Sequence, residues 1–131
     1  MLSVTELDGI ARARLEDAEV LLDGCRYDGA VYLCGYAVEV ALKARICRTL
    51  VWEGYPSTTG EFRNLQSFKT HDLDVLLALS GVERKIKTEL LAHWSAVAQW
   101  DPEVRYKPIG KAGPDETRLM VESAKVLLRE L

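Results

Sequence analysis

Four polar side chains that could do chemistry fall within the long apolar segment at residues 27–48: Tyr32, Tyr36, Glu39 and Lys43. They step by four, three and four residues, so they share one face of a helix. A helix that is apolar nearly all round belongs at the centre of a bundle, where charges are paired or used. The stripe is either a buried Glu39–Lys43 pair that orders the bundle, or a polar pocket in which Lys43 meets a phosphate. The structural interpretation is favoured, because Glu39 at helical spacing already supplies Lys43 with a partner.

A second candidate is His71, which follows Thr70 and precedes Asp72 and Asp74. Its ring could bond locally to either aspartate or to a neighbouring helix, which would make it architectural. As a general base, it would need a polarised nucleophile or leaving group within hydrogen-bond reach, and the sequence shows none. The architectural interpretation is favoured here as well.

A third candidate is Arg105-Tyr106-Lys107, in the irregular segment that follows Pro102. The arginine could hold a phosphate with its two-pronged donor face while the tyrosine ring stacks on a base. Alternatively, Arg105 ties this segment back to the bundle, to Glu39 or to Asp101. Both interpretations stay open. Arg105 and Tyr106 are nevertheless the preferred ligand-binding candidates, because loops carry sites more often than bundle interiors do.

Composition narrows the class of protein. The 131 residues predict one domain, 1–131, and the formal charge of −3 excludes a strongly basic nucleic-acid binder without excluding local phosphate binding. Three cysteines without a CxxC pair are interpreted as small buried residues in a reduced, cytoplasmic protein. No signal peptide, membrane span, metal constellation or glycine-rich phosphate loop is recognised, so we expect no membrane association, no metal and no cofactor.

The elements that must position these residues are all predicted to be helices. They are expected at about residues 4–23, 28–53, 70–79, 80–100 and 114–131. The predicted caps are a capping box at Ser3 and Glu6, Asp28, Thr70, and a second capping box at Ser80 and Glu83. Gly24 is expected to stop the first helix in a left-handed conformation, and Gly54 with Pro56 to end the second. Residues 54–70 and 101–113 are expected to be irregular, and the class is all-α with antiparallel neighbours.

Several of these motifs resemble the HEPN family of small helical domains. They are the pattern ARARLEDAEVLLDGCRYDGAVYLCGYAVEVALKARI, the Thr-His-Asp-Leu step at residues 70–73, and a tryptophan followed after ten residues by Arg105-Tyr106. The most specific piece is Ala37–Lys43. The resemblance implies an up-down antiparallel four-helix bundle with a shorter additional C-terminal helix, packed as a homodimer. It also implies binding of a nucleotide or RNA, as a ribonuclease or as the partner of a minimal nucleotidyltransferase in a toxin–antitoxin pair.

One departure from the family changes the expected activity. Ribonuclease members carry an arginine followed after four to six residues by a histidine, and neither His71 nor His93 follows an arginine at that distance. We therefore expect a non-catalytic module that binds a nucleotide or RNA or docks a nucleotidyltransferase. A divergent metal-independent ribonuclease using Arg105 and His71, and a structural helical adaptor, remain the alternatives.

Overall fold

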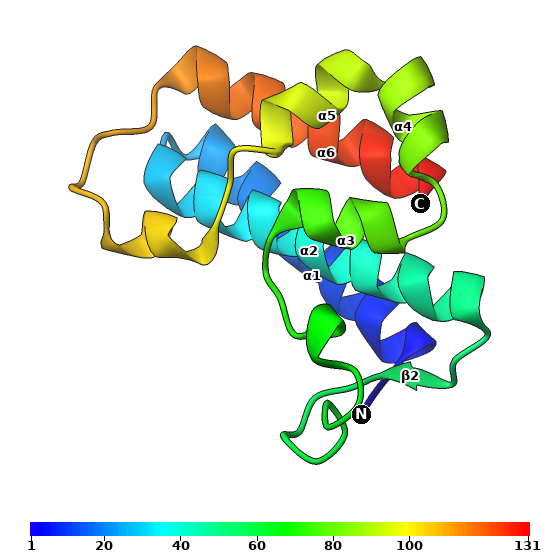
Figure 1. Ribbon diagram of the computed structural model, residues 1–131. Helices are drawn as coiled ribbons and strands as arrows, with labels where there is room; N and C mark the ends of the chain where they lie inside the picture. Colours follow the sequence, from blue (N-terminus) through cyan, green and yellow to red (C-terminus); the bar gives the residue numbers. More distant parts are fainter.

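The computed structural model describes all 131 residues and is mainly helical, which agrees with the predicted all-α class (Figure 1). Its elements are β1 (Leu2–Ser3), α1 (Val4–Asp23), α2 (Tyr27–Leu50), β2 (Gly54–Tyr55), η1 (Gln66–Phe68), α3 (Leu73–Leu79), α4 (Glu83–Glu89), α5 (Leu91–Val97), η2 (Pro102–Tyr106) and α6 (Pro114–Glu130), where η marks a 3-10 helix. The two short strands were not predicted. They pair antiparallel, with Leu2 opposite Tyr55 and Ser3 opposite Gly54, and two residues are too few to show an alternating pattern.

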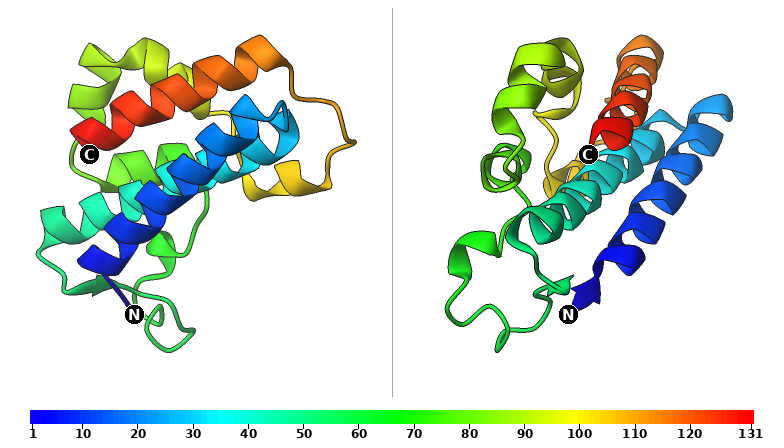
Figure 2. Two further views of the ribbon diagram at one scale, coloured as in Figure 1. Left: turned by 180° about the vertical axis from the view of Figure 1, so that it is seen from behind. Right: turned by 90° about the vertical axis from the view of Figure 1, so that its right-hand side faces the viewer.

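The helix α2 forms the centre of the molecule. It runs antiparallel to α1 and also contacts α6, α3 and η2, so that half of its 24 residues are buried (Figure 2). This position follows from its sequence, since a helix with apolar residues nearly all round must be covered on several sides. Cys34 and Cys47 are buried within it, as predicted, whereas Cys25 is exposed. None of the helices combines the length and the apolar character that a membrane crossing requires.

The start of α1 is as predicted, but the turn after the end of this helix is not. The amide of Glu6 donates to Ser3 Oγ at 3.1 Å and the amide of Ser3 donates to Glu6 Oε2 at 2.8 Å, which completes the capping box. Gly24 is not the left-handed residue, because its φ is −85°. The Gly24 amide still donates to the Val20 carbonyl, as in a helix. The left-handed residue is the next one, Cys25, which has a φ of 59°.

The ends of α2 also differ from the prediction. The helix begins at Tyr27 without a side-chain cap, and Asp28 lies in its first turn. The Asp28 carboxylate instead accepts from the amides of Gly110 and Ala112, far along the chain. The helix ends at Leu50 rather than near residue 53, because Val51 already adopts a left-handed conformation with a φ of 56°.

The segment at residues 54–70 contains the missed elements β2 and η1 and its own aromatic cluster. The rings of Trp52 and Phe68 lie 4.9 Å apart, and Tyr55 contacts Phe62 and Phe68 edge-on. The Tyr55 hydroxyl donates to the carbonyl of Phe68. These contacts fold the segment back onto the end of α2.

The predicted helices between residues 70 and 100 are shorter in the structure, because different residues cap them. Asp72, not Thr70, caps α3: its carboxylate accepts from the amides of Asp74 and Val75. The predicted capping box at Ser80 is absent, since the Ser80 hydroxyl donates to the Leu77 carbonyl and accepts from the Val82 amide.

The expected helix at residues 80–100 is divided into α4 and α5 at Leu90, which has a φ of −132° and a ψ of 31°. Ile86 on α4 and Trp94 on α5 are both buried. Each of α3, α4 and α5 has seven residues, whereas α6 has 17. A bundle of four long helices with a shorter C-terminal helix is therefore not confirmed by this arrangement.

A close contact between Gly35 on α2 and Trp100 joins the centre of the molecule to the end of α5. A β-carbon at Gly35 would overlap the indole ring of Trp100, which is buried. We expect Gly35→Ala to lower the free energy of unfolding in urea by about 1–3 kcal/mol, the usual effect of overpacking. Gly9→Ala is the matched control. Gly9 is also helical but has nothing within 4 Å of an added β-carbon, so the change should stabilise by about 0.5–1 kcal/mol. A stabilising Gly35→Ala would contradict the assigned packing.

Candidate functional site

The polar stripe on α2 runs past three other parts of the chain. Tyr32 lies at the end covered by η2, Glu39 lies beside residues 70–72, and Lys43 lies beside Tyr55. With a rise of about 1.5 Å per residue, the stripe from Tyr32 to Lys43 is about 16 Å long. The candidate residues are therefore arranged along a line and divide into two groups.

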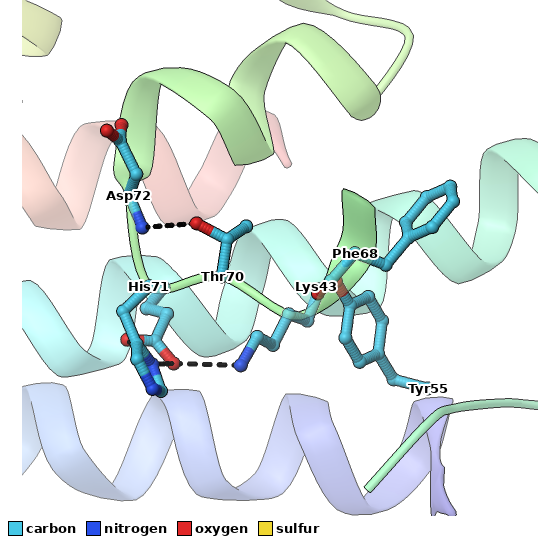
Figure 3. A network of polar contacts seen from close by, with 7 residues as sticks. Lys43, Tyr55, Phe68, Thr70, His71 and Asp72 are labelled. Atoms are coloured by element: carbon cyan, nitrogen blue, oxygen red, sulfur yellow. Dashed lines mark hydrogen bonds and ion pairs between the residues drawn. The ribbon is translucent and has the colours of Figure 1, made fainter. Parts of the chain in front are cut away.

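The first group centres on Glu39, whose side chain is only 3% exposed. Its partners Lys43 and His71 lie close together, as Figure 3 shows. The Glu39 Oε2 atom accepts from Lys43 Nζ at 2.9 Å. His71 Nδ1 lies 3.1 Å from both Oε1 and Oε2. The sequence suggested Asp72, Asp74 or a neighbouring helix as the partner of His71, and the structure shows the neighbouring helix, through Glu39. One buried carboxylate thus holds two cationic or potentially cationic groups.

Burial distinguishes the two partners of Glu39. The Lys43 side chain is 16% exposed, and its ammonium lies 5.3 Å from the ring centroid of Tyr55, whose pKa is raised by burial. The His71 side chain is 65% exposed. Because an ionised carboxylate only accepts hydrogen bonds, His71 Nδ1 is the donor. In the neutral ring, Nε2 then carries the lone pair, and this atom could accept a proton from a bound molecule.

The second group consists of Arg105, Tyr106 and Tyr32. A hydrogen bond to the Tyr32 side chain, and a second to Tyr106, raise the pKa of the Arg105 guanidinium. Arg105 Cζ also lies 5.0 Å from the ring centroid of Tyr106, which is 73% exposed. The sequence offered Glu39 or Asp101 as structural partners of Arg105, and neither is its partner. Asp101 instead caps η2 by accepting from the amide of Glu103.

The structure adds residues that the sequence did not single out as functional. Asp28 holds residues 110–112 through the amides of Gly110, at 2.7 Å, and Ala112, at 3.1 Å, and these two donors keep the pKa of Asp28 below its usual value. The exposed cations Lys107 and Lys111 flank the same turn, and neither forms an ion pair. No local signal could have linked Asp28 to this turn, because the partners are more than 80 residues apart.

Two hollows lie on the surface of the molecule, and neither is lined by Glu39 or His71. The larger, of about 540 Å³, lies between α1, α2 and α6. The smaller, of about 290 Å³, lies between the first turns of α2, the end of α5, η2 and α6, and Lys107 and Lys111 are among its lining residues. No group of three or more histidine, cysteine, aspartate or glutamate side chains is arranged to hold a metal ion.

Comparison with known proteins identifies one family. The family model described as the HEPN domain matches residues 5–131, nearly the whole chain. No match was found among curated proteins or among solved structures.

The Glu39 contacts lead to a stability prediction. Lys43→Met should lower the free energy of unfolding by about 2–3 kcal/mol, because it leaves a buried carboxylate with the His71 imidazole as its only remaining side-chain partner. The double change Glu39→Leu with Lys43→Met should restore at least half of that loss, because no buried charge is then left unpaired. Urea denaturation at pH 7 measures both. If Lys43→Met alone matched the parent protein, Glu39 would be satisfied without its lysine.

Proposed function

The chain belongs to the HEPN domain family, and from that membership we propose that it is a non-catalytic module that binds a nucleotide or RNA. The binding group is the segment that carries Arg105 and Tyr106. The observation that supports this assignment is the difference in charge pairing between the two ends of the α2 stripe.

At the Glu39 end, the charges are already matched. Lys43 is bound to Glu39 and largely enclosed, so a phosphate there would have to compete with a buried carboxylate. A lysine held in this way is a poor phosphate ligand. The geometry therefore favours the structural role for Lys43 and for the polar stripe of Tyr32, Tyr36 and Glu39 around it.

At the other end, the cations are free. Arg105, Lys107 and Lys111 are exposed and form no ion pair. The guanidinium can bind a phosphate with two parallel hydrogen bonds. The exposed Tyr106 ring beside it can stack on a base, a contact that tolerates any base sequence. Together they can bind one phosphate and the adjoining base.

The assembly proposed for this module follows the family. It is a single domain of residues 1–131 that forms a homodimer, with an up-down four-helix core and a minimal nucleotidyltransferase as its possible partner in a toxin–antitoxin pair. The larger hollow is lined by apolar side chains, among them Ala11, Leu15 and Leu128, and by charged ones such as Arg12 and Glu16, and this mixed lining is compatible with a protein partner.

The binding proposal is tested at Arg105. We expect Arg105→Gln to weaken binding of a fluorescein-labelled single-stranded oligoribonucleotide at least tenfold, because a hydrogen bond to a charged group contributes about 1.5–3 kcal/mol. Fluorescence anisotropy measures the affinity, and circular dichroism should show unchanged helicity. Arg84→Gln is the control, since Arg84 is also exposed and unpaired but lies on α4. Equal affinity of both variants would remove Arg105 from the site. Absence of any RNA or nucleotide binding by the parent protein would favour the structural adaptor.

A second candidate function is metal-independent RNA cleavage, and one observation favours it. Glu39 orients His71 so that the exposed ring can accept a proton, as a general base must. On this hypothesis, purified protein cleaves RNA in the presence of EDTA, and His71→Gln and Arg105→Ala each abolish cleavage. His93→Gln should retain activity, since His93 is the chain's other histidine and is bonded to Ser123. If the parent protein leaves RNA intact in EDTA, this function is excluded.

A further inference from the structure

We propose that the 290 Å³ hollow between α2, α5, η2 and α6 binds the nucleoside part of a mononucleotide unit, with Lys107 and Lys111 on its phosphate. The inference rests on the proposed nucleotide or RNA binding and extends it. Arg105 and Tyr106 then hold the adjoining phosphate and base of a longer RNA.

The size and lining of the hollow suit a nucleoside. Its volume is close to the lower end of small-molecule sites, which is about 300 Å³. One part of the wall is apolar and includes Val31, Trp100 and Met120. The side chains of Gln99 and Glu116 also line it, and neither has a hydrogen-bond or ion-pair partner within the protein. An apolar wall with a few free polar groups is the usual composition of a site for a planar, polar-edged ligand.

The outer wall is held in place without a ligand. Asp28, on the first turn of α2, accepts from the amides of Gly110 and Ala112 and so ties the turn at residues 107–112 to the helix. Figure 1 shows this turn as the loop between η2 and α6. Gly110 adopts a φ of 91°, which other residues rarely take. A wall that is already formed lowers the ordering cost of binding.

The charges at the hollow favour an anion beside the turn. Lys107 and Lys111 both line the hollow and neither is paired. Asp28 also lines it, but its carboxylate is occupied by two backbone donors. Glu116 is the remaining acid. A phosphate placed between the two lysines therefore meets two cations that have no internal partner.

Trp100 provides a spectroscopic reporter within the hollow. Its indole ring packs on Gly35 and lies 6.4 Å from the Tyr32 ring, so its position is fixed by α2. Its Nε1–H is buried and has no hydrogen-bond partner, which is uncommon for a tryptophan. A ligand that enters the hollow changes the surroundings of this ring directly. The other two tryptophans serve as references, because Trp94 is bonded to Asp74 and Trp52 lies in the aromatic cluster near β2.

The experiment compares a mononucleotide with its parts. Adenosine monophosphate, adenosine, ribose 5-phosphate and inorganic phosphate are titrated into ¹⁵N-labelled protein, and indole and backbone signals are followed by NMR. We expect adenosine monophosphate to shift the Trp100 indole signal and the amides of Lys111 and Ala112. Trp52 and Trp94 should be unaffected. Adenosine and ribose 5-phosphate should each bind at least tenfold more weakly, and inorganic phosphate more weakly still.

Two variants separate the two halves of the site, and a third serves as the control. The double change Lys107→Gln with Lys111→Gln should weaken adenosine monophosphate at least tenfold and leave adenosine unchanged. Ala96→Leu, which adds volume at the α5 wall, should weaken both and leave inorganic phosphate unchanged. Lys69→Gln is the control, since Lys69 is also exposed and unpaired but lies after η1. The lysine variant changes only exposed side chains, so it tests the proposal even if Ala96→Leu does not fold.

The outcomes distinguish this inference from the proposed function. If adenosine monophosphate shifts only signals around Arg105 and Tyr106, or if both hollow variants bind it as tightly as the parent protein does, the hollow is not the subsite and the RNA-binding proposal stands. If RNA binds in an Arg105-dependent way but no mononucleotide binds, the inference is overturned alone. If neither RNA nor mononucleotide binds, both fail together.

Discussion

The burial of Glu39 is the constraint on which the polar architecture depends. A buried carboxylate carries a desolvation penalty of several kcal/mol unless partners surround it. Lys43 provides one partner from the same helix, and His71 provides the other from a segment 32 residues away in sequence. Because His71 must reach Glu39, residues 70–72 lie against α2, and α3 begins immediately afterwards at its Asp72 cap. A single charge in an apolar helix thereby positions the chain that leads into α3.

The two ends of the α2 stripe differ in charge pairing, and this difference is the basis for the location of the proposed site. Near Glu39, the cations are matched by a carboxylate. Near Tyr32, the cations of η2 and of the turn after it are exposed and form no ion pair, and the Asp28 carboxylate that contacts the turn accepts from two backbone amides. Gly35 allows Trp100 to approach α2 closely at the same end, which fixes the start of η2. The packing of Trp100 on Gly35 thus holds this end of the molecule in place, and the unpaired cations near it can attract an anion.

Local patterns in the sequence were sufficient for α1, for the extent of α2 to within a few residues and for the Glu39–Lys43 pair, because each depends on spacing within one helix. They were insufficient where several possible caps lie close together. Thr70 and Asp72 can both cap a helix, and the cap is Asp72, while Thr70 bonds to the Asp72 amide. No glycine or proline marks the break at Leu90 in the sequence. The contacts of His71 with Glu39 and of Asp28 with Gly110 join distant segments, so no helical periodicity could predict them.

The spacing along α2 also explains why binding is a better-supported function than cleavage. Tyr32, which lies near Arg105, and Glu39, which holds His71, are seven residues apart, or about 10 Å along the helix. Tyr36 lies between them on the same face. A general base must come within about 3 Å of the proton that it removes. Arg105 and His71 of one chain therefore meet different parts of a bound RNA, unless the strand is bent across Tyr36 or a second subunit brings the two groups together. Binding needs no such convergence, since Arg105 can hold one phosphate while neighbouring cations hold the next.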